Sequence, residues 1–267
     1  MPANPHDRLM CLDIETVPDR SLMPADWPEG KFPAKPLWHR VVAISFVEAR
    51  IEPERDTGVE RYAVTACRPV GEAGWVERDL LEAFWASFAR SPARVVSWAG
   101  RQFDIPVLLV RSLVHAVPAP VWYRSGTKWE NYTQRFGGYH TDLMEQLADH
   151  GACARMGLDE VARALGLPGK VGGYGSQVEE MAGRGELDRV RAYCEADCLN
   201  LFGLYCRFAL LTGRVDRAGH EASLGSLTAY LDGQRAARPI LGEFLDRWQA
   251  SASSPSAPAP ASVAALA

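Results

Sequence analysis

The alternation of apolar and polar positions in the first half of the chain predicts short strands and amphipathic helices. Three runs rich in β-branched and apolar residues are expected as strands that form a meander: Arg8 to Val17, Val41 to Glu48 and Arg61 to Ala66. Helical spacing follows over Trp75 to Ala89. A buried strand over Arg94 to Trp98 and a helix over Phe103 to Val114 then complete a βα unit.

The second half of the chain has helical spacing. Helices are expected over Leu158 to Leu165, Ser176 to Met181 and Glu186 to Leu211, with two more between Ser223 and Trp248. Strands followed by helices predict an α/β fold, with a mixed sheet flanked by helices and a helical C-terminal part. We expect a domain over residues 1–212, C-terminal helices at 213–250 packing on it, and a disordered Ala/Ser/Pro tail at 251–267.

Composition excludes several classes of protein. Of the 267 residues, 47% are hydrophobic and 23% charged, which provides ample material for a core and excludes wholesale disorder. The net charge of −4 argues against a protein that coats DNA by overall charge. No membrane-spanning run or secretion signal is found, so a cytoplasmic protein is expected. The six cysteines contain no C-x-x-C pair and are expected to be reduced.

Two acidic residues share one face of the first strand. Its period of two places Asp13 and Glu15 on the face of Cys11, opposite the apolar Leu12 and Ile14. Positions i and i+2 lie about 7 Å apart, so two carboxylates on a packed face repel each other and are poorly solvated. A divalent cation would resolve both problems. The alternative is a solvent-exposed face with ordinary surface charges.

The helix expected over Glu186 to Leu211 carries a third acid in its packing face. Asp197 points within about 40° of the centre of the apolar stripe, and Tyr193 lies one turn earlier on the same side. The phenol of Tyr193 can therefore share a site with the carboxylate. A buried Asp197 paired with a base or a helix cap elsewhere is the alternative.

A fourth acid, Asp104, follows the turn after the buried strand. It precedes Ile105 and Pro106, and a proline in the first helical turn makes Asp104 a natural N-cap. The tip of a strand-to-helix turn is also where α/β folds place ligand-binding groups. Both interpretations stay open. Asp142 is a possible fifth acid near the site, although structural capping is favoured for it.

Together these motifs resemble the three exonuclease motifs of the DEDD superfamily of 3′-to-5′ exonucleases, which have a ribonuclease-H-like fold. Asp13-Ile14-Glu15 resembles Asp-x-Glu, Phe103-Asp104 the end of the second motif, and Tyr193-x-x-x-Asp197 the third. The tyrosine is typical of the DEDDy branch, because the sister branch has a histidine where this chain has Ala192. More narrowly, residues 8–212 resemble stand-alone bacterial proteins related to the exonuclease domain of family B DNA polymerases.

The resemblance implies a metal-dependent nuclease. Carboxylates Asp13, Glu15, Asp104 and Asp197 would form an oxygen-only cage for two Mg²⁺ or Mn²⁺ ions, with Asp13 shared and Asp104 acting through water. Tyr193 would orient the attacking water. The implied reaction is hydrolysis at the 3′ end of nucleic acid, with single-stranded DNA favoured and nucleoside 5′-monophosphates released. Proofreading would require a protein partner, whose identity the sequence does not give.

One position departs from the family pattern. Asn usually stands five residues before the second-motif Asp, and this chain has Ala99 there, which removes a side-chain amide. A non-catalytic nucleic-acid-binding module that retains the fold is therefore the first alternative. A structure-selective endonuclease on the same fold is the second.

Substrate contact is expected near an aromatic-rich stretch. Trp122 to Tyr139 interleaves aromatic residues with Arg124, Lys128 and Arg135, a mixture suited to stacking bases and contacting phosphates. A packed hairpin is the alternative for this stretch. The Pro-rich segment Pro18 to Pro36 is interpreted as a surface loop. The candidate substrate contacts are Arg101, Phe103, Lys128, Trp129 and Arg135.

Overall fold

A computed structural model describes residues 6–28, 30–173 and 175–252, and its strands form one five-stranded sheet. The strands are β1 (Arg8–Pro18), β2 (His39–Pro53), β3 (Glu60–Pro69), β4 (Arg94–Ser97) and β5 (His140–Asp142), in the order β3-β2-β1-β4-β5. The first three are antiparallel, whereas β4 and β5 run parallel to β1. The predicted meander and the mixed sheet are confirmed.

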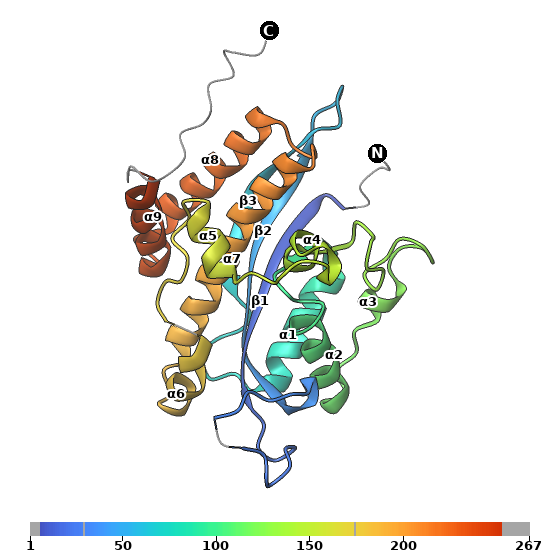
Figure 1. Cartoon of the computed structure of the whole chain (residues 1–267), viewed down its shortest axis with the longest axis vertical. Coiled ribbons are helices and arrows are strands. Elements are labelled where there is room, and N and C mark those ends of the chain that lie inside the picture. Colours follow the sequence, from blue (N-terminus) through green and yellow to red (C-terminus); the bar gives the residue numbers. More distant parts are fainter. Residues whose placement is uncertain (1–5, 29, 174, 253–267) are drawn as a thin grey trace.

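Helices cover both faces of the sheet (Figure 1). On one face lie α1 (Glu77–Arg90), α2 (Asp104–Val114) and α3 (Pro120–Arg124). The other face is covered mainly by α7 (Leu187–Leu211), with α5 (Leu158–Ala164), α6 (Val178–Gly183), α8 (Arg217–Gln234) and α9 (Pro239–Ala252) around it. Shorter elements are α4 (Leu143–Leu147) and the 3-10 turns Pro36–Trp38, Asp149–Gly151 and Gly175–Gln177.

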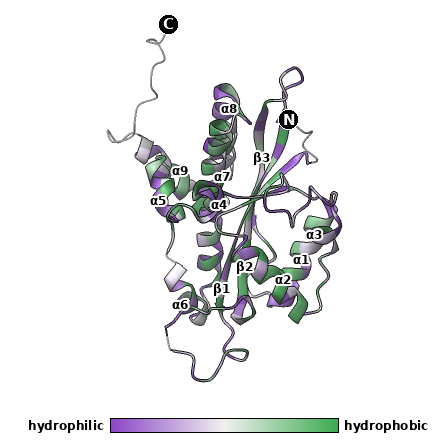
Figure 2. Cartoon of the chain, turned by 45° about the vertical axis from the view of Figure 1, so that its right-hand side comes forward, coloured by the Kyte–Doolittle hydropathy of each residue, from purple (hydrophilic) through white to green (hydrophobic). Residues whose placement is uncertain are grey.

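The central strand β1 is packed on both faces, as its alternation predicts. Met10, Leu12 and Ile14 join the core under α1 and α2, whereas Leu9 and Cys11 join the core under α7. Figure 2 shows hydrophobic residues along the central strands, while α8 and α9 carry both hydrophobic and hydrophilic residues. The residues next to Cys11 on its face are therefore held between β1 and α7.

Helix α8 protects the free edge of the sheet. Three of its hydroxyl groups accept hydrogen bonds of 2.9 Å from backbone N–H groups of β3: Ser223 from Tyr62, Ser226 from Val64, and Tyr230 from Cys67. The register of β2 and β3 shifts between Glu48 and Ala49, so the spacing of these N–H groups grows from two to three residues. The acceptors on α8, at positions 223, 226 and 230, are spaced three and then four residues apart, which matches this increase.

The stretch from residue 122 to 140 differs from the hairpin given as an alternative for it. It contains α3 and an irregular loop with no strand over its described residues 125–139. Trp122, Tyr132 and Tyr139 are buried in the core beside α1, so the loop is fixed by packed rings. Tyr123, Trp129 and Phe136 are exposed. The hairpin prediction is wrong because the aromatic side chains pack against a helix layer.

Two further outcomes concern the cysteines and the C-terminus. All six cysteines are free thiols, and five of them are buried, as expected. Helix α9 continues through Ser251 to Ala252, so the tail prediction is two residues too long at its start. The rest of the predicted tail, 253–267, lies outside the described residues. Within the described part of the chain, no helix has the length and apolar character to cross a membrane.

Candidate metal centre

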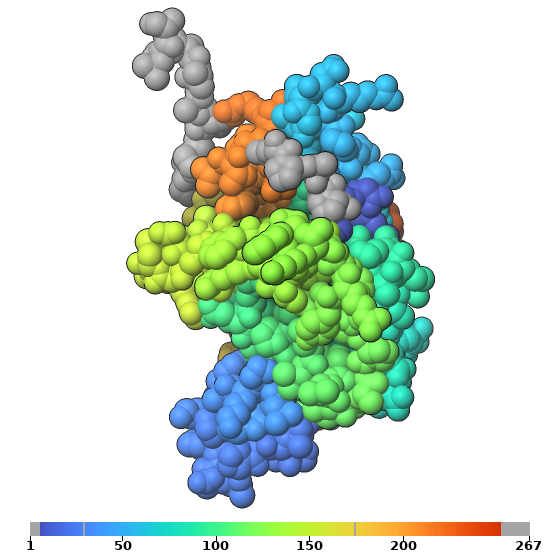
Figure 3. Space-filling model, turned by 90° about the vertical axis from the view of Figure 1, so that its right-hand side faces the viewer, coloured from blue at the N-terminus to red at the C-terminus, as the bar shows by residue number. Residues whose placement is uncertain are grey.

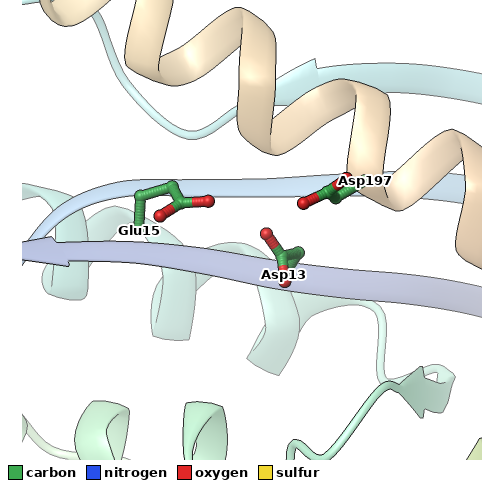
Figure 4. A group of neighbouring side chains, drawn as sticks. All are labelled: Asp13, Glu15 and Asp197. Atoms are coloured by element: carbon green, nitrogen blue, oxygen red, sulfur yellow. The ribbon is translucent and has the colours of Figure 1, made fainter. Parts of the chain in front are cut away.

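Three carboxylates from two distant segments meet between β1 and α7. Asp13 and Glu15 lie on β1, and Asp197 lies on α7. One oxygen of each lies within 4.8 Å of the other two, so a single cation can reach all three. Figure 4 shows the side chains of Asp13 and Glu15 directed toward the space beneath Asp197. The structure thus brings the first and third acidic motifs together.

This face of β1 is packed rather than open to solvent. Cys11 is fully buried against residues of α7, and Asp13 and Glu15 are each half-buried. The alternative of an exposed strand face with ordinary surface charges is therefore wrong. The acids are held side by side because α7 packs along the strand whose alternation points both of them at it.

Asp104 lies behind this group and is almost completely buried, with 3% of its surface exposed. Its Oδ1 accepts a hydrogen bond from the backbone N–H of Ile14 at 3.2 Å. Phe103 is the N-cap residue of α2 and Asp104 is the first residue of the helix, so the N-cap interpretation is wrong. Asp104 is instead fixed to the strand that carries Asp13 and Glu15.

Burial raises the pKa of each carboxyl in this cluster, and repulsion between members of the cluster raises the pKa of Asp13 and Glu15 further. The pKa of Asp13 is raised first by burial and then by the charges of Asp104 and Glu15. Burial followed by the charge of Asp197 raises the pKa of Glu15. Burial raises the pKa of Asp104 to about 7 and that of Asp197 to about 6. The cluster therefore favours a bound cation or bound protons over four free charges.

Tyr193 and Cys194 contact the carboxylates from α7. The phenol of Tyr193 shares a hydrogen bond with Asp197, and burial and the nearby acids raise the pKa of the phenol. Tyr193 thus stays protonated at neutral pH and acts through hydrogen bonds. The Cys194 thiol donates to the Asp13 backbone carbonyl and to its Oδ2, both at 3.4 Å. A thiol is a weak donor, so it leaves most of the Asp13 charge uncompensated.

A cavity of about 430 Å³ opens beside these groups. Asp13, Tyr193 and Asp197 form part of its wall, and the remaining lining is Trp98, Gly157, Leu158, Asp159, Glu160 and Lys170. The positive charge of Lys170 lowers the pKa of both Glu15 and Asp197. Sequence reasoning missed this lysine because no spacing relates it to the acidic motifs. The packing of α5 against α7 and the hydrogen bonds between Gly169 and Asn200 of α7 bring its segment to the site.

The Ala99 turn adopts an unusual backbone conformation. Ala99 has φ of 59°, in the left-handed region that favours Gly and Asn. Its N–H and that of Arg101 donate to the carboxylate of Asp142, at 3.0 and 2.9 Å. Asp142 also caps α4 by accepting from the Glu145 N–H, which confirms its predicted capping role. Both bonds use backbone N–H groups of the turn, so neither requires an Asn side chain at position 99.

The five candidate substrate contacts differ in how strongly the rest of the protein holds them. Arg101 donates to the backbone carbonyls of Gln134 and His140, and Arg135 pairs with Glu145 at 3.1 Å. Phe103 contacts the ring of His39 at the start of β2, 4.9 Å away between centroids, and the ring of Phe32 in the β1–β2 loop, 5.8 Å away. Lys128 and Trp129 are exposed, with the ammonium 4.8 Å from the ring centroid. Contact of all five with substrate stays a prediction.

Comparison with known families agrees with this geometry. Residues 31–248 match a family described as predicted 3′-5′ exonucleases related to the exonuclease domain of PolB. The chain belongs to this family. Membership in the exonuclease family together with the mixed sheet confirms the ribonuclease-H-like α/β fold. No curated protein matches the chain.

The exonuclease-family match covers more than the second and third motifs. It runs through α8 and most of α9, so these helices belong to the family pattern. It begins after Asp13 and Glu15, whose place in the site comes from the structure alone. The family and the acidic cluster support a nuclease that acts on nucleic acid.

Proposed function

We propose that this chain is a metal-dependent 3′-to-5′ exonuclease that shortens single-stranded nucleic acid, with DNA preferred, and releases nucleoside 5′-monophosphates. The observation that carries the proposal is the group Asp13, Glu15 and Asp197, whose oxygens lie within 4.8 Å of one another. Asp104 lies behind them as a fourth buried acid. Family membership supports the same reaction class.

The donor set fits divalent cations. Every candidate ligand is a carboxylate oxygen, which suits Mg²⁺ or Mn²⁺ better than zinc. The raised pKa values of these acids have burial as their main cause and mutual repulsion as a further one, and a bound cation relieves both. Asp13, Glu15 and Asp197 would hold the ions directly, and Asp104 would support the second through water. Two such ions supply an activated water and charge stabilisation for the leaving 3′ oxygen.

The remaining residues position groups around this centre. Tyr193 is protonated and bonded to Asp197, so its hydroxyl orients the attacking water rather than removing a proton from it. Ile14 fixes the orientation of the Asp104 carboxylate through its N–H. Lys170 places a positive charge in the cavity, where the phosphate of a terminal nucleotide would lie.

The test is degradation of matched 5′-labelled single-stranded DNA and RNA with Mg²⁺, Mn²⁺ or EDTA. We expect a ladder that shortens from the 3′ end, faster for DNA, and that disappears in EDTA. Asp13→Ala and Asp197→Ala should each remove it, because each deletes a ligand. Asp188→Ala is the matched control, since Asp188 is exposed on the first turn of the same helix.

Two outcomes would contradict the proposal. Intact strands under every metal condition, together with retained strand binding, would favour the non-catalytic binding module. Cleavage of a circular single strand would indicate an endonuclease. In the first case Ala99→Asn shows whether the missing amide accounts for the lost turnover.

A further inference from the structure

Trp98 lines the cavity beside the carboxylates, and the scheme above gives it no role. It directly follows β4, and its half-buried side chain lines the same cavity as Asp13 and Asp197. It also packs on the core between the sheet and α7. Trp98 is therefore held by the core while part of its surface faces the site.

The indole of Trp98 packs on the core but has no polar or aromatic partner among the described residues. Among the described residues it has no hydrogen bond and no ring contact, unlike other buried tryptophans. Trp85 donates to the Ser112 hydroxyl at 2.8 Å, and Trp122 stacks on Tyr132 with centroids 4.8 Å apart. Buried tryptophans usually find a partner for the N–H group. Trp98 thus keeps a π face and one donor for a ligand in the cavity.

The cavity has the same polarity division as a nucleotide. Trp98 and Leu158 form its apolar part, and its charged lining residues are Lys170 and the acids Asp13, Asp159, Glu160 and Asp197. Its volume of about 430 Å³ is within the range of sites that enclose small ligands. Figure 3 shows a recess between the projecting segment near residues 145–160, in yellow-green, and the loop after β1, in blue.

We propose that Trp98 is the surface on which the base of the 3′-terminal nucleotide stacks, with Leu158 completing the apolar wall. The inference rests on the proposed exonuclease function and adds its substrate class: strands whose last nucleotide carries a base, whichever base it is. Every base has a π face. Stacking on an aromatic ring therefore selects for a base without selecting its identity.

The test compares two 5′-labelled single strands that differ only at the last position, a deoxynucleotide or a tetrahydrofuran abasic residue. Wild-type protein should remove the base-bearing residue about tenfold faster in kcat/KM. Trp98→Leu, which keeps apolar volume in the core, should remove both residues at the wild-type abasic rate. Trp98→Phe should retain most of the preference. Trp75→Leu, a change at an exposed tryptophan before α1, should behave as wild type.

A binding measurement makes the result independent of turnover. With Ca²⁺ in place of Mg²⁺, fluorescence anisotropy should show that Trp98→Leu weakens binding of the base-terminated strand but not of the abasic one. Equal loss on both strands, or no base preference in the wild type, would overturn the role of Trp98. Absence of any metal-dependent shortening would instead contradict the exonuclease proposal, and the binding comparison would still decide the role of Trp98.

Discussion

Ile14 donates its backbone N–H to Asp104 Oδ1 at 3.2 Å, from the position on β1 between Asp13 and Glu15. The same strand therefore presents two carboxylates to one side and anchors a third from α2. The bond fixes the orientation of the Asp104 side chain beside the cluster.

Because of this bond, two substitutions at Asp104 should affect stability differently. Asp104→Asn keeps an acceptor for the Ile14 N–H and removes a buried charge, so metal-free protein should melt at a higher temperature than wild type at pH 8. Asp104→Ala leaves the N–H unpaired, at a cost of about 1–3 kcal/mol. Both should lose most activity. Thermal melting in EDTA measures the difference, and an Asn variant less stable than the Ala variant would refute the role of the bond.

Metal-free protein should lose stability as pH rises. The pKa values in the folded state are about 7 for Asp104 and about 6 for Asp197, against about 3.9 for an unfolded aspartate. Between about pH 4 and pH 7 the folded state therefore binds more protons than the unfolded state, and the free energy of unfolding falls with pH. Melting temperatures in EDTA should be lower at pH 8 than at pH 5.5, with a smaller drop in Asp104→Asn.

Divalent cations should reverse this trend. Because ligands must lose protons to bind a metal, Mn²⁺ should raise the melting temperature strongly at pH 8 and weakly at pH 5.5. A stabilisation independent of pH would show that the ion binds away from the acidic cluster.

Lys170 should tune the pH dependence of activity. Its charge lowers the pKa of Glu15 and Asp197, so Lys170→Met should raise both and move the onset of activity to higher pH. We expect kcat/KM to fall about tenfold at pH 6.5, a change of about 1.4 kcal/mol, and to fall less at pH 8.5. Lys170→Arg is the control that retains charge. An identical loss at every pH would exclude this electrostatic role.

The left-handed backbone conformation at Ala99 leads to a prediction about the free energy of unfolding. A non-glycine residue in this conformation costs about 1–2 kcal/mol, so Ala99→Gly and Ala99→Asn should each stabilise the protein by about 1 kcal/mol. Ala116, with φ of 54°, provides a matched site after α2 where Ala→Gly should give the same gain. Chemical denaturation measures both. Destabilisation by Ala99→Gly would contradict the argument.

The parts of the site that sequence predicts are those set by local periodicity. Asp13 and Glu15 follow from alternation along one strand, and Asp197 and Tyr193 follow from the helical repeat. The N-cap interpretation of Asp104 failed because its partner, Ile14, lies ninety residues earlier, beyond any local signal. Lys170 has no local signal at all. These contacts depend on how layers pack, which periodicity does not encode.

The aromatic stretch shows the same limit. Its composition left open a packed hairpin, yet the structure has no strand over residues 125–139, and Trp122, Tyr132 and Tyr139 fill the core beside α1. Whether an aromatic side chain faces a helix or solvent depends on a layer formed by residues 77–90, some forty positions earlier. Fold class was predictable because strand and helix periods alone determine which layers can form.

The hydroxyl contacts of α8 give a final prediction. Ser223→Ala should destabilise the protein by about 1–3 kcal/mol, because it leaves the buried Tyr62 N–H without an acceptor. Ser226→Ala should cost less, since Val64 is only half-buried. Neither change should alter kcat at a temperature where the variant is folded. Urea denaturation with parallel rate measurements tests both. If Ser223→Ala leaves the free energy of unfolding unchanged, the bond between α8 and this sheet edge does not contribute to stability.

The same contacts decide how this sheet meets other proteins. A strand edge with free N–H groups is a template for pairing with another chain, and β3 would be such an edge over ten residues. With Ser223, Ser226 and Tyr230 occupying those donors, no foreign strand can extend the sheet there, and the opposite edge offers only the three residues of β5. A protein partner would therefore dock on helices or loops, and self-association by strand pairing at this edge is suppressed while α8 is in place.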